Sequence, residues 1–181
     1  MTDENIKSGL IPAELQIRAV GCDLSAALAA LNARSFLGLS ARPWTVEDFN
    51  QILGDEKSRA FGAFLSSREM AGYVLLRQVF DEAEILSIGV LESCRGKGIG
   101  STLITSAAQS AIEAGANRLL LEVAEDNTTA IRFYENLGFA EIGKRPKYYL
   151  CDRNSRHIAA LLLAVPLPLV GSEPRPATAT T

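Results

Sequence analysis

Residues 83–100 read AEILSIGVLESCRGKGIG, and this stretch decides the fold. An apolar, strand-like segment at 83–90 is followed by a short loop and by a glycine-rich sequence that opens a helical pattern. Glycines let the backbone approach a ligand closely, and a helix N-terminus offers unpaired N–H groups and the positive end of the helix dipole. Together with the charges of Arg95 and Lys97, these features predict a site for a phosphate or pyrophosphate.

The spacing around this loop excludes the two common nucleotide-binding motifs. A P-loop needs Gly at position 91 and Ser or Thr at position 98, where the sequence has Leu91 and Gly98. A dinucleotide fingerprint that starts at Gly96 needs a third Gly at position 101, which is Ser101. From spacing alone, the remaining alternative is a glycine-rich helix entry on a solvated loop.

Outward from this stretch, the hydrophobic pattern predicts seven strands and four helices. The strand-like segments lie at 15–20, 59–65, 70–79, 83–90, 118–123, 139–143 and 158–165. The helical segments lie at 24–36, 46–53, 98–114 and 128–137. The first half supplies antiparallel hairpins and the second half supplies strand–helix–strand crossovers. This order predicts an α/β (α+β) fold with a mixed seven-stranded sheet and helices on both faces.

Length and composition predict one globular domain. The chain has 181 residues, of which 48% are hydrophobic and 22% charged, a mix that excludes a disordered chain, a collagen-like chain and a coiled coil. We expect a flexible segment at 1–14, one domain at 15–168 and a disordered tail at 169–181, because the last segment is small, polar and proline-containing.

Net charge, cysteine spacing and the lack of long apolar stretches argue against several classes of protein. The net charge of −3 does not favour nucleic-acid binding. Three cysteines far apart in the sequence argue against a disulfide framework and a zinc site, so we expect no metal. Residues 1–10 lack the apolar run of a signal peptide, and no apolar stretch reaches the ~20 residues that span a membrane. We therefore expect a cytoplasmic protein.

A second group of candidate residues follows the predicted strand at 118–123. Glu122 lies near the end of this apolar strand, and ligands of α/β sheets gather at the carboxyl ends of strands. Asn127 can cap the next helix, and Tyr134 lies two turns into it. From the residues alone, a surface acid and a core tyrosine are the more common roles of Glu122 and Tyr134.

The motifs themselves resemble a known family. The pattern R-x-x-G-x-G at Arg95, Gly98 and Gly100, placed after a strand, resembles the acetyl-CoA loop of the GNAT superfamily of N-acetyltransferases. The stretch L-E-V-x-x-x-N-x-x-A-x-x-x-Y-E-x-L-G-F at 121–139 and the later R-P-x-Y-Y at 145–149 resemble the ribosomal-protein-alanine N-acetyltransferases. The likeness covers roughly residues 15–166.

This resemblance implies a function and a set of site residues. It implies acetyl-CoA as the acetyl donor, Glu122 as the general base, Tyr134 as the acid that protonates the leaving thiolate, and direct transfer to the N-terminal α-amine of a protein or peptide, such as a ribosomal protein. The residues that it assigns to the coenzyme are Ile88, Gly89, Val90, Arg95, Gly96, Lys97, Gly98, Ile99, Gly100, Ser101 and Asn127. The alternatives are a small-molecule amine or a lysine as acceptor, and a non-catalytic acyl-CoA-binding sensor. In each case we expect neither a nucleic-acid nor a membrane partner.

The charge near the expected acceptor site is uneven. Residues 144–157 contain five Lys or Arg and one acid, Asp152, which would not favour a basic N-terminus. The acids Glu47, Asp48, Asp55 and Glu56 could offset this charge if the second helix borders the groove. We expect this imbalance to influence which acceptor binds.

Overall fold

The computed structural model describes residues 15–36, 42–65, 69–151 and 156–169. The predicted flexible segment at 1–14 and all of the predicted tail at 169–181 except Leu169 lie outside these residues. Leu169, placed at the start of the predicted tail, is buried in the core at 6% exposure. Among the described residues, the core therefore extends one residue beyond the expected end of the domain at 168.

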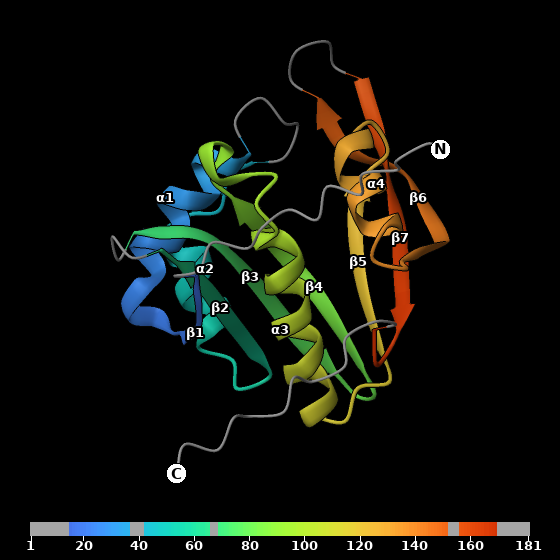
Figure 1. Cartoon of the computed structure of the whole chain (residues 1–181). Helices are drawn as coiled ribbons and strands as arrows, with labels where there is room; N and C mark the ends of the chain where they lie inside the picture. Colours follow the sequence, from blue (N-terminus) through green and yellow to red (C-terminus); the bar gives the residue numbers. More distant parts are fainter. Residues whose placement is uncertain (1–14, 37–41, 66–68, 152–155, 170–181) are drawn as a thin grey trace, which may run out of the picture.

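Within the described residues, seven strands form one mixed sheet, as predicted (Figure 1). Their order in the sheet is β1-β2-β3-β4-β5-β7-β6. The strands are β1 Gln16–Val20, β2 Ser58–Phe64, β3 Met70–Val79, β4 Glu82–Val90, β5 Arg118–Ala124, β6 Ala140–Cys151 and β7 Arg156–Pro166. Neighbours pair antiparallel except β4 and β5, which pair parallel and are connected by a helical crossover. β7 lies between β5 and β6 in the sheet and pairs antiparallel with both.

Helices cover both faces of the sheet, which confirms the predicted layers. Figure 1 shows α3 and α4 on one face and α1 and α2 on the other. The α-helices of the described residues are α1 Ser25–Ser35, α2 Val46–Leu53, α3 Ile99–Glu113 and α4 Thr128–Glu135, and short 3-10 turns precede α1 and α3. The start of α2 is fixed locally, because Thr45 and Asp48 form a capping box that satisfies two backbone N–H groups.

Strand β6 is longer than the sequence pattern predicted. We expected a strand at 139–143, but β6 continues to Cys151 and pairs with β7 along most of this length. Gly143 and Pro146 resemble strand breakers, yet the register shifts between Glu141 and Gly143 and again between Arg145 and Tyr149 accommodate them. The prediction ended the strand too early because a bulged strand has no simple two-residue period.

The parallel strands β4 and β5 separate in the middle of the sheet. Their pairing runs from Glu82 with Arg118 to Ile85 with Leu121 and then stops, although β4 continues to Val90 and β5 to Ala124. The register between β3 and β4 shifts at the same level, next to Ile85. An irregular ladder increases local twist and bends a strand. Figure 1 shows the two strands diverging toward the end of the sheet where α3 begins.

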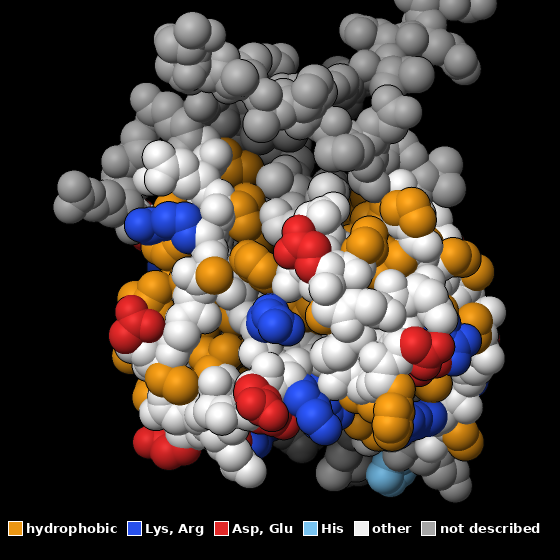
Figure 2. Space-filling view, turned by 90° about the horizontal axis from the view of Figure 1, so that it is seen from below, with side chains coloured by type: hydrophobic (Ala, Val, Ile, Leu, Met, Phe, Trp, Pro, Cys, Tyr) orange, Lys and Arg blue, Asp and Glu red, His pale blue; other side chains and the backbone are white. Residues whose placement is uncertain are grey.

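At the opposite end of the sheet, where β4 pairs with both β3 and β5, ion pairs link these strands. Arg77 pairs with Glu84 across β3 and β4, and Arg118 pairs with Glu82 across β5 and β4. Figure 2 views the molecule from below and shows acidic and basic side chains intermixed with hydrophobic ones on this face. The end of the sheet that holds β4 and β5 together is therefore mixed in charge.

Candidate active site

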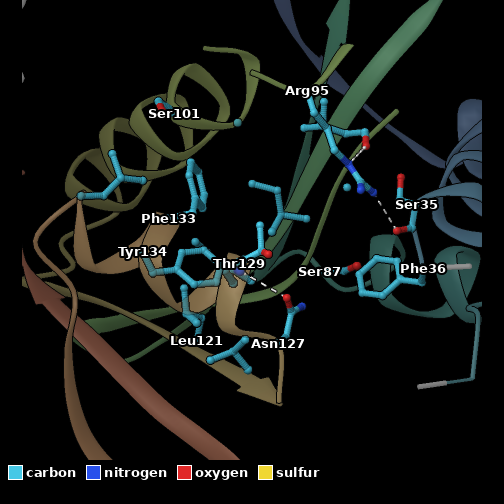
Figure 3. A pocket seen from close by; sticks show the side chains of 18 of the residues that line it. Ser35, Phe36, Ser87, Arg95, Ser101, Leu121, Asn127, Thr129, Phe133 and Tyr134 are labelled. Carbon is cyan, nitrogen blue, oxygen red and sulfur yellow. Dashed lines mark hydrogen bonds between the residues drawn. The ribbon is translucent and has the colours of Figure 1, made fainter. Parts of the chain in front are cut away.

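A large cavity opens where β4 and β5 diverge. Its volume is about 2090 Å³, above the ~300–1,000 Å³ of a typical small-ligand pocket, so it has room for a coenzyme and an acceptor. Every predicted site residue lines it except Lys97, whose side chain is exposed outside the lining. Figure 3 shows α3 and α4 on one side of this cavity, and Ser35, Phe36 and Ser87 on the other.

The glycine-rich loop forms the entrance to α3. Gly96 and Gly98 have φ values of 74° and 76°, left-handed backbone that favours glycine, and Gly98 is the N-cap of α3. Gly100 fills a different need, because a Cβ at this position would lie 3.1 Å from Cζ of Phe133 on α4. The loop thus turns the chain sharply into α3, and Gly100 lets α4 pack closely against this first turn.

The side chain of Arg95 connects two elements at the edge of the cavity. Its Nε donates to the Val90 carbonyl at 3.2 Å and its Nη2 donates to the Ser35 carbonyl at 3.1 Å (Figure 3). These bonds join the end of β4 to the end of α1. Arg95 therefore fixes the shape of the site in addition to adding the positive charge that the sequence predicted.

Tyr134 and Asn127 enter the cavity from α4 and from the turn before it. Tyr134 is 7% exposed, and its ring packs against those of Phe133 and Phe139 at centroid distances of 5.2 and 5.6 Å. Its side chain lies beside Leu121 of β5 in Figure 3. Asn127 caps α4 as predicted, because its Oδ1 accepts a hydrogen bond from the Ala130 N–H at 3.2 Å. Both side chains are held in fixed positions at the cavity wall.

Glu122 lies on the β5 side of the gap with two partners from β6. Its side chain is 18% exposed, and its Oε1 lies 3.1 Å from Nε of Arg145. The Tyr148 hydroxyl donates a hydrogen bond to Glu122. The negative charge of Glu122, followed by burial and this hydrogen bond, raises the pKa of Tyr148. Glu84 of β4 is a further acid close enough to act on Tyr148.

The charges around the cavity differ from the sequence prediction. Lys144 and Arg145, from the basic stretch, are paired with Glu125 and Glu122 at the end of β5. The acids of α2 and its following turn do not line the described cavity, and Asp48 pairs with Arg42 at 2.9 Å instead. The acidic residues in the lining are Glu84, Glu92, Glu122, Asp126 and Glu135. Acidic charge therefore comes from β4, β5 and their adjoining loops and helix.

A buried polar network that was not predicted from the sequence borders the same site. Nδ2 of Asn32 donates to the Tyr73 hydroxyl at 2.7 Å, and this hydroxyl lies 2.5 Å from Oγ of Ser87. Oδ1 of Asn32 accepts from the backbone N–H of Trp44 at 2.8 Å. Burial raises the pKa of Tyr73 to about 12. Asn32 and Ser87 are single polar residues within otherwise apolar helix and strand segments, and this pattern could have indicated that they are buried and hydrogen-bonded.

Two further findings concern the described residues only. Within these ranges, no group of three or more His, Cys, Asp or Glu is placed to hold a metal ion. None of the helices in the same part of the chain is long and apolar enough to cross a membrane.

Cys94 is buried next to the glycine-rich loop and forms no disulfide. A small spacer fits this position better than a covalent acetyl carrier.

Comparison with known proteins agrees with this geometry. Residues 26–139 match the model of the acetyltransferase (GNAT) family. The chain belongs to this family. It is an acetyltransferase that uses acetyl-CoA as the acetyl donor, and the resemblance predicted from the motifs is confirmed.

Individual relatives cover different parts of this GNAT chain. It is 30% identical over 130 residues to a ribosomal protein bS18-alanine N-acetyltransferase of Salmonella typhimurium, covering 71% of this chain and 84% of the relative. It is 35% identical over 83 residues to a mycothiol acetyltransferase of Corynebacterium aurimucosum, covering 44% and 27%. The crystal structure of the ribosomal-protein-S18-alanine N-acetyltransferase from Escherichia coli has a TM-score of 0.75 and 26% identity, with 88% and 97% coverage.

Proposed function

We propose that this chain acetylates the α-amine of a protein N-terminus in the cytoplasm, with a ribosomal protein as the acceptor. The observation that carries the proposal is the gap beyond the Ile85–Leu121 pair, with Glu122 on β5 and Tyr134 on α4 in its lining. The bS18-alanine N-acetyltransferase relative, which matches over most of its length, supports a protein N-terminus as the acceptor class. The acidic residues around the cavity favour a positively charged acceptor.

The same proposal assigns acetyl-CoA to the glycine loop and the diverging part of β4. The first turn of α3 offers backbone N–H groups and the positive dipole end to the pyrophosphate. The separation from β5 leaves backbone groups of β4 without partners in that strand, and these would hold the pantetheine arm. The coenzyme-binding residues are Ile88, Gly89, Val90, Arg95, Gly96, Gly98, Ile99, Gly100, Ser101 and Asn127, with Lys97 contributing charge from outside the lining.

The chemistry is a direct transfer between the two bound substrates. Glu122 takes a proton from the acceptor amine, through a water molecule, and the amine nitrogen bonds to the thioester carbonyl carbon. The carbon–sulfur bond breaks, and Tyr134 gives its proton to the departing thiolate. A peptide α-amine has a reference pKa of ~7.7–8.0, so a large fraction is neutral near pH 7–8 and a weak base is sufficient. A lysine, with a reference pKa of ~10.4, needs a stronger base.

The acceptor can be identified by offering acetyl-CoA with three kinds of amine and reading the products by mass spectrometry. The first set of peptides starts with Ala and carries ribosomal-protein sequences, the controls contain lysine behind a blocked N-terminus, and the third set contains small-molecule amines. We expect acetylation of the free N-terminus alone. Acetylation of lysine or of the small amines would support the alternative acceptors, and no transfer with intact coenzyme binding would support the sensor.

Replacing Tyr134 by Phe tests the assigned acid. Tyr134→Phe keeps the ring that packs against Phe133 and Phe139 and removes the hydroxyl. Because general acid catalysis is worth ~10²–10⁴-fold, we expect kcat to fall by about that factor. Calorimetry should show acetyl-CoA affinity close to that of the wild type. Unchanged turnover would contradict the assigned role of Tyr134.

A further inference from the structure

The two partners of Glu122 come from a strand that is not its neighbour. β7 separates β5 from β6, so the side chains of Arg145 and Tyr148 cross β7 to reach Glu122. Arg145 is 56% exposed, whereas Glu122 is 18% exposed. An exposed guanidinium therefore lies over a mostly covered carboxylate at the cavity wall.

A bulge in β6 makes this arrangement possible. Arg145 pairs with Ala160, and the next pair joins Tyr149 to Ile158, so four steps along β6 match two steps along β7. Positions three apart in a regular strand face opposite sides of the sheet, but the extra residues let Arg145 and Tyr148 reach the same carboxylate. Pro146 is tolerated inside the bulge because it has no N–H to donate to a ladder.

We propose that Arg145 is a positioning residue that holds the Glu122 carboxylate in the orientation required for proton transfer. The inference rests on the proposed function of Glu122 as general base. The charge-assisted bond from Nε of Arg145 engages Oε1 of Glu122 and restrains the rotation of the carboxylate. Catalytic groups need this precision, because a displacement of ~1 Å can reduce a rate by ~10²-fold.

A stabilising role alone does not account for the pair. Ion pairs with an exposed partner contribute only ~0–1 kcal/mol to stability. Arg145 of β6 pairs with Glu122, and Tyr148 of β6 interacts with both Glu122 and Glu84 of β4. Arg145 is the cation among these four residues, so its removal leaves the Glu122 carboxylate without the positive charge of the pair.

The neighbouring ion pair provides a matched control. Lys144 precedes Arg145 on β6 and pairs with Glu125. Glu125 is the first residue after β5, the strand that carries Glu122. Glu125 also accepts a hydrogen bond from the Ala159 N–H at 3.2 Å, so this carboxylate stays anchored when Lys144 is replaced. Lys144→Met therefore removes the same charge from the same strand without changing the partners of Glu122.

The experiment compares Arg145→Met, Arg145→Lys and Lys144→Met with the wild type, using an Ala-starting peptide and acetyl-CoA. We expect Arg145→Met to reduce kcat by roughly 10- to 100-fold with little change in Tm or in the KM for acetyl-CoA. Arg145→Lys should recover part of the loss, because lysine keeps the charge without the planar guanidinium. Lys144→Met should behave as the wild type.

A double-mutant cycle shows whether Arg145 acts through Glu122. In the Glu122→Gln background, followed by single-turnover kinetics, Arg145→Met should cause no further loss. Additive losses, or a normal kcat for Arg145→Met while Glu122→Gln is impaired, would overturn the inference and leave the base assignment standing. If Glu122→Gln keeps full activity, the base assignment of the proposed function is wrong and the inference fails with it.

Discussion

Gly100 shows how one residue without a side chain lets two helices of the candidate site pack together. It lies in the first turn of α3, and a Cβ there would come within 3.1 Å of the Phe133 ring. Valine adds two further methyl groups at this point, so we expect Gly100→Val to displace α4, which also carries Tyr134. The expected result in isothermal titration calorimetry is the loss of measurable acetyl-CoA binding.

A second glycine controls for general destabilisation. Gly115 has a φ of 89° and nothing within 4 Å of its would-be Cβ, and it lies beyond the far end of α3. Gly115→Ala strains the backbone by ~1–3 kcal/mol without touching the cavity, so acetyl-CoA affinity should persist. Tight coenzyme binding by Gly100→Val would mean that the loop and α4 tolerate separation, contrary to the structure.

At the scale of elements, the buried hydroxyl of Tyr73 joins α1, β3 and β4. Its pKa is raised from 10.0 to about 12 because ionisation is unfavourable in the core. Because the folded state holds this proton more tightly than the unfolded state, Tyr73 does not lower the free energy of unfolding below pH 10. Above pH 10 the free energy of unfolding decreases, until the pH passes the folded-state pKa of about 12. Two pKa units correspond to roughly 3 kcal/mol. Denaturant unfolding between pH 9 and 12 should therefore show a loss of about this size.

Tyr73→Phe is the control for this alkaline loss. The phenylalanine ring keeps the edge contact with Phe49, at a centroid distance of 5.8 Å, and removes the ionisable group. The variant starts less stable at pH 9, because Asn32 and Ser87 lose a partner. Its stability should then change less with pH than that of the wild type. An equal slope in both proteins would show that other groups cause the alkaline loss.

Elements with local signals were predicted well, and those that depend on distant partners were not. Helix α2 begins and ends where predicted, because Thr45 caps it with the reciprocal contact of Asp48. The predicted strand ended at Gly143, whereas β6 continues to Cys151, because its continuation depends on pairing with β7 through two register shifts. Propensity within the strand carries no information about that partner.

The same distinction applies to the site. The glycine-rich loop at 95–100 and the stretch from Glu122 to Tyr134 are contiguous motifs, so the sequence alone could single them out, and residues of both line the cavity. Arg145 was expected only to add positive charge near the acceptor, because its contact with Glu122 crosses an intervening strand. Ser87 was not singled out, because its partners Tyr73 and Asn32 lie on other elements.

At the scale of the whole molecule, a short parallel ladder between β4 and β5 joins two parts of the sheet. One part is β1-β2-β3-β4 and the other is β5-β7-β6. The ladder spans residues 82–85 of β4 and 118–121 of β5. The side-chain bond from Asn117 to Asp81, at 2.8 Å, lies at the same end. Beyond the ladder the strands diverge, and there acetyl-CoA would bridge the two parts. Because a ligand that binds only the folded state stabilises it by RT ln(1 + [L]/Kd), we expect ~2.7 kcal/mol at 100 times Kd.

Hydrogen exchange can show whether that stabilisation begins in the gap. Residues 86–90 of β4 and 122–124 of β5 have no mutual ladder, whereas 82–85 of β4 are paired on both sides. We therefore expect acetyl-CoA to slow exchange at short times mainly in 86–90 and 122–124, with little change in 82–85. Mass spectrometry of overlapping peptides can resolve these segments. Equal slowing in all three would indicate only global stabilisation, and no slowing in 86–90 at saturating coenzyme would place the pantetheine arm elsewhere.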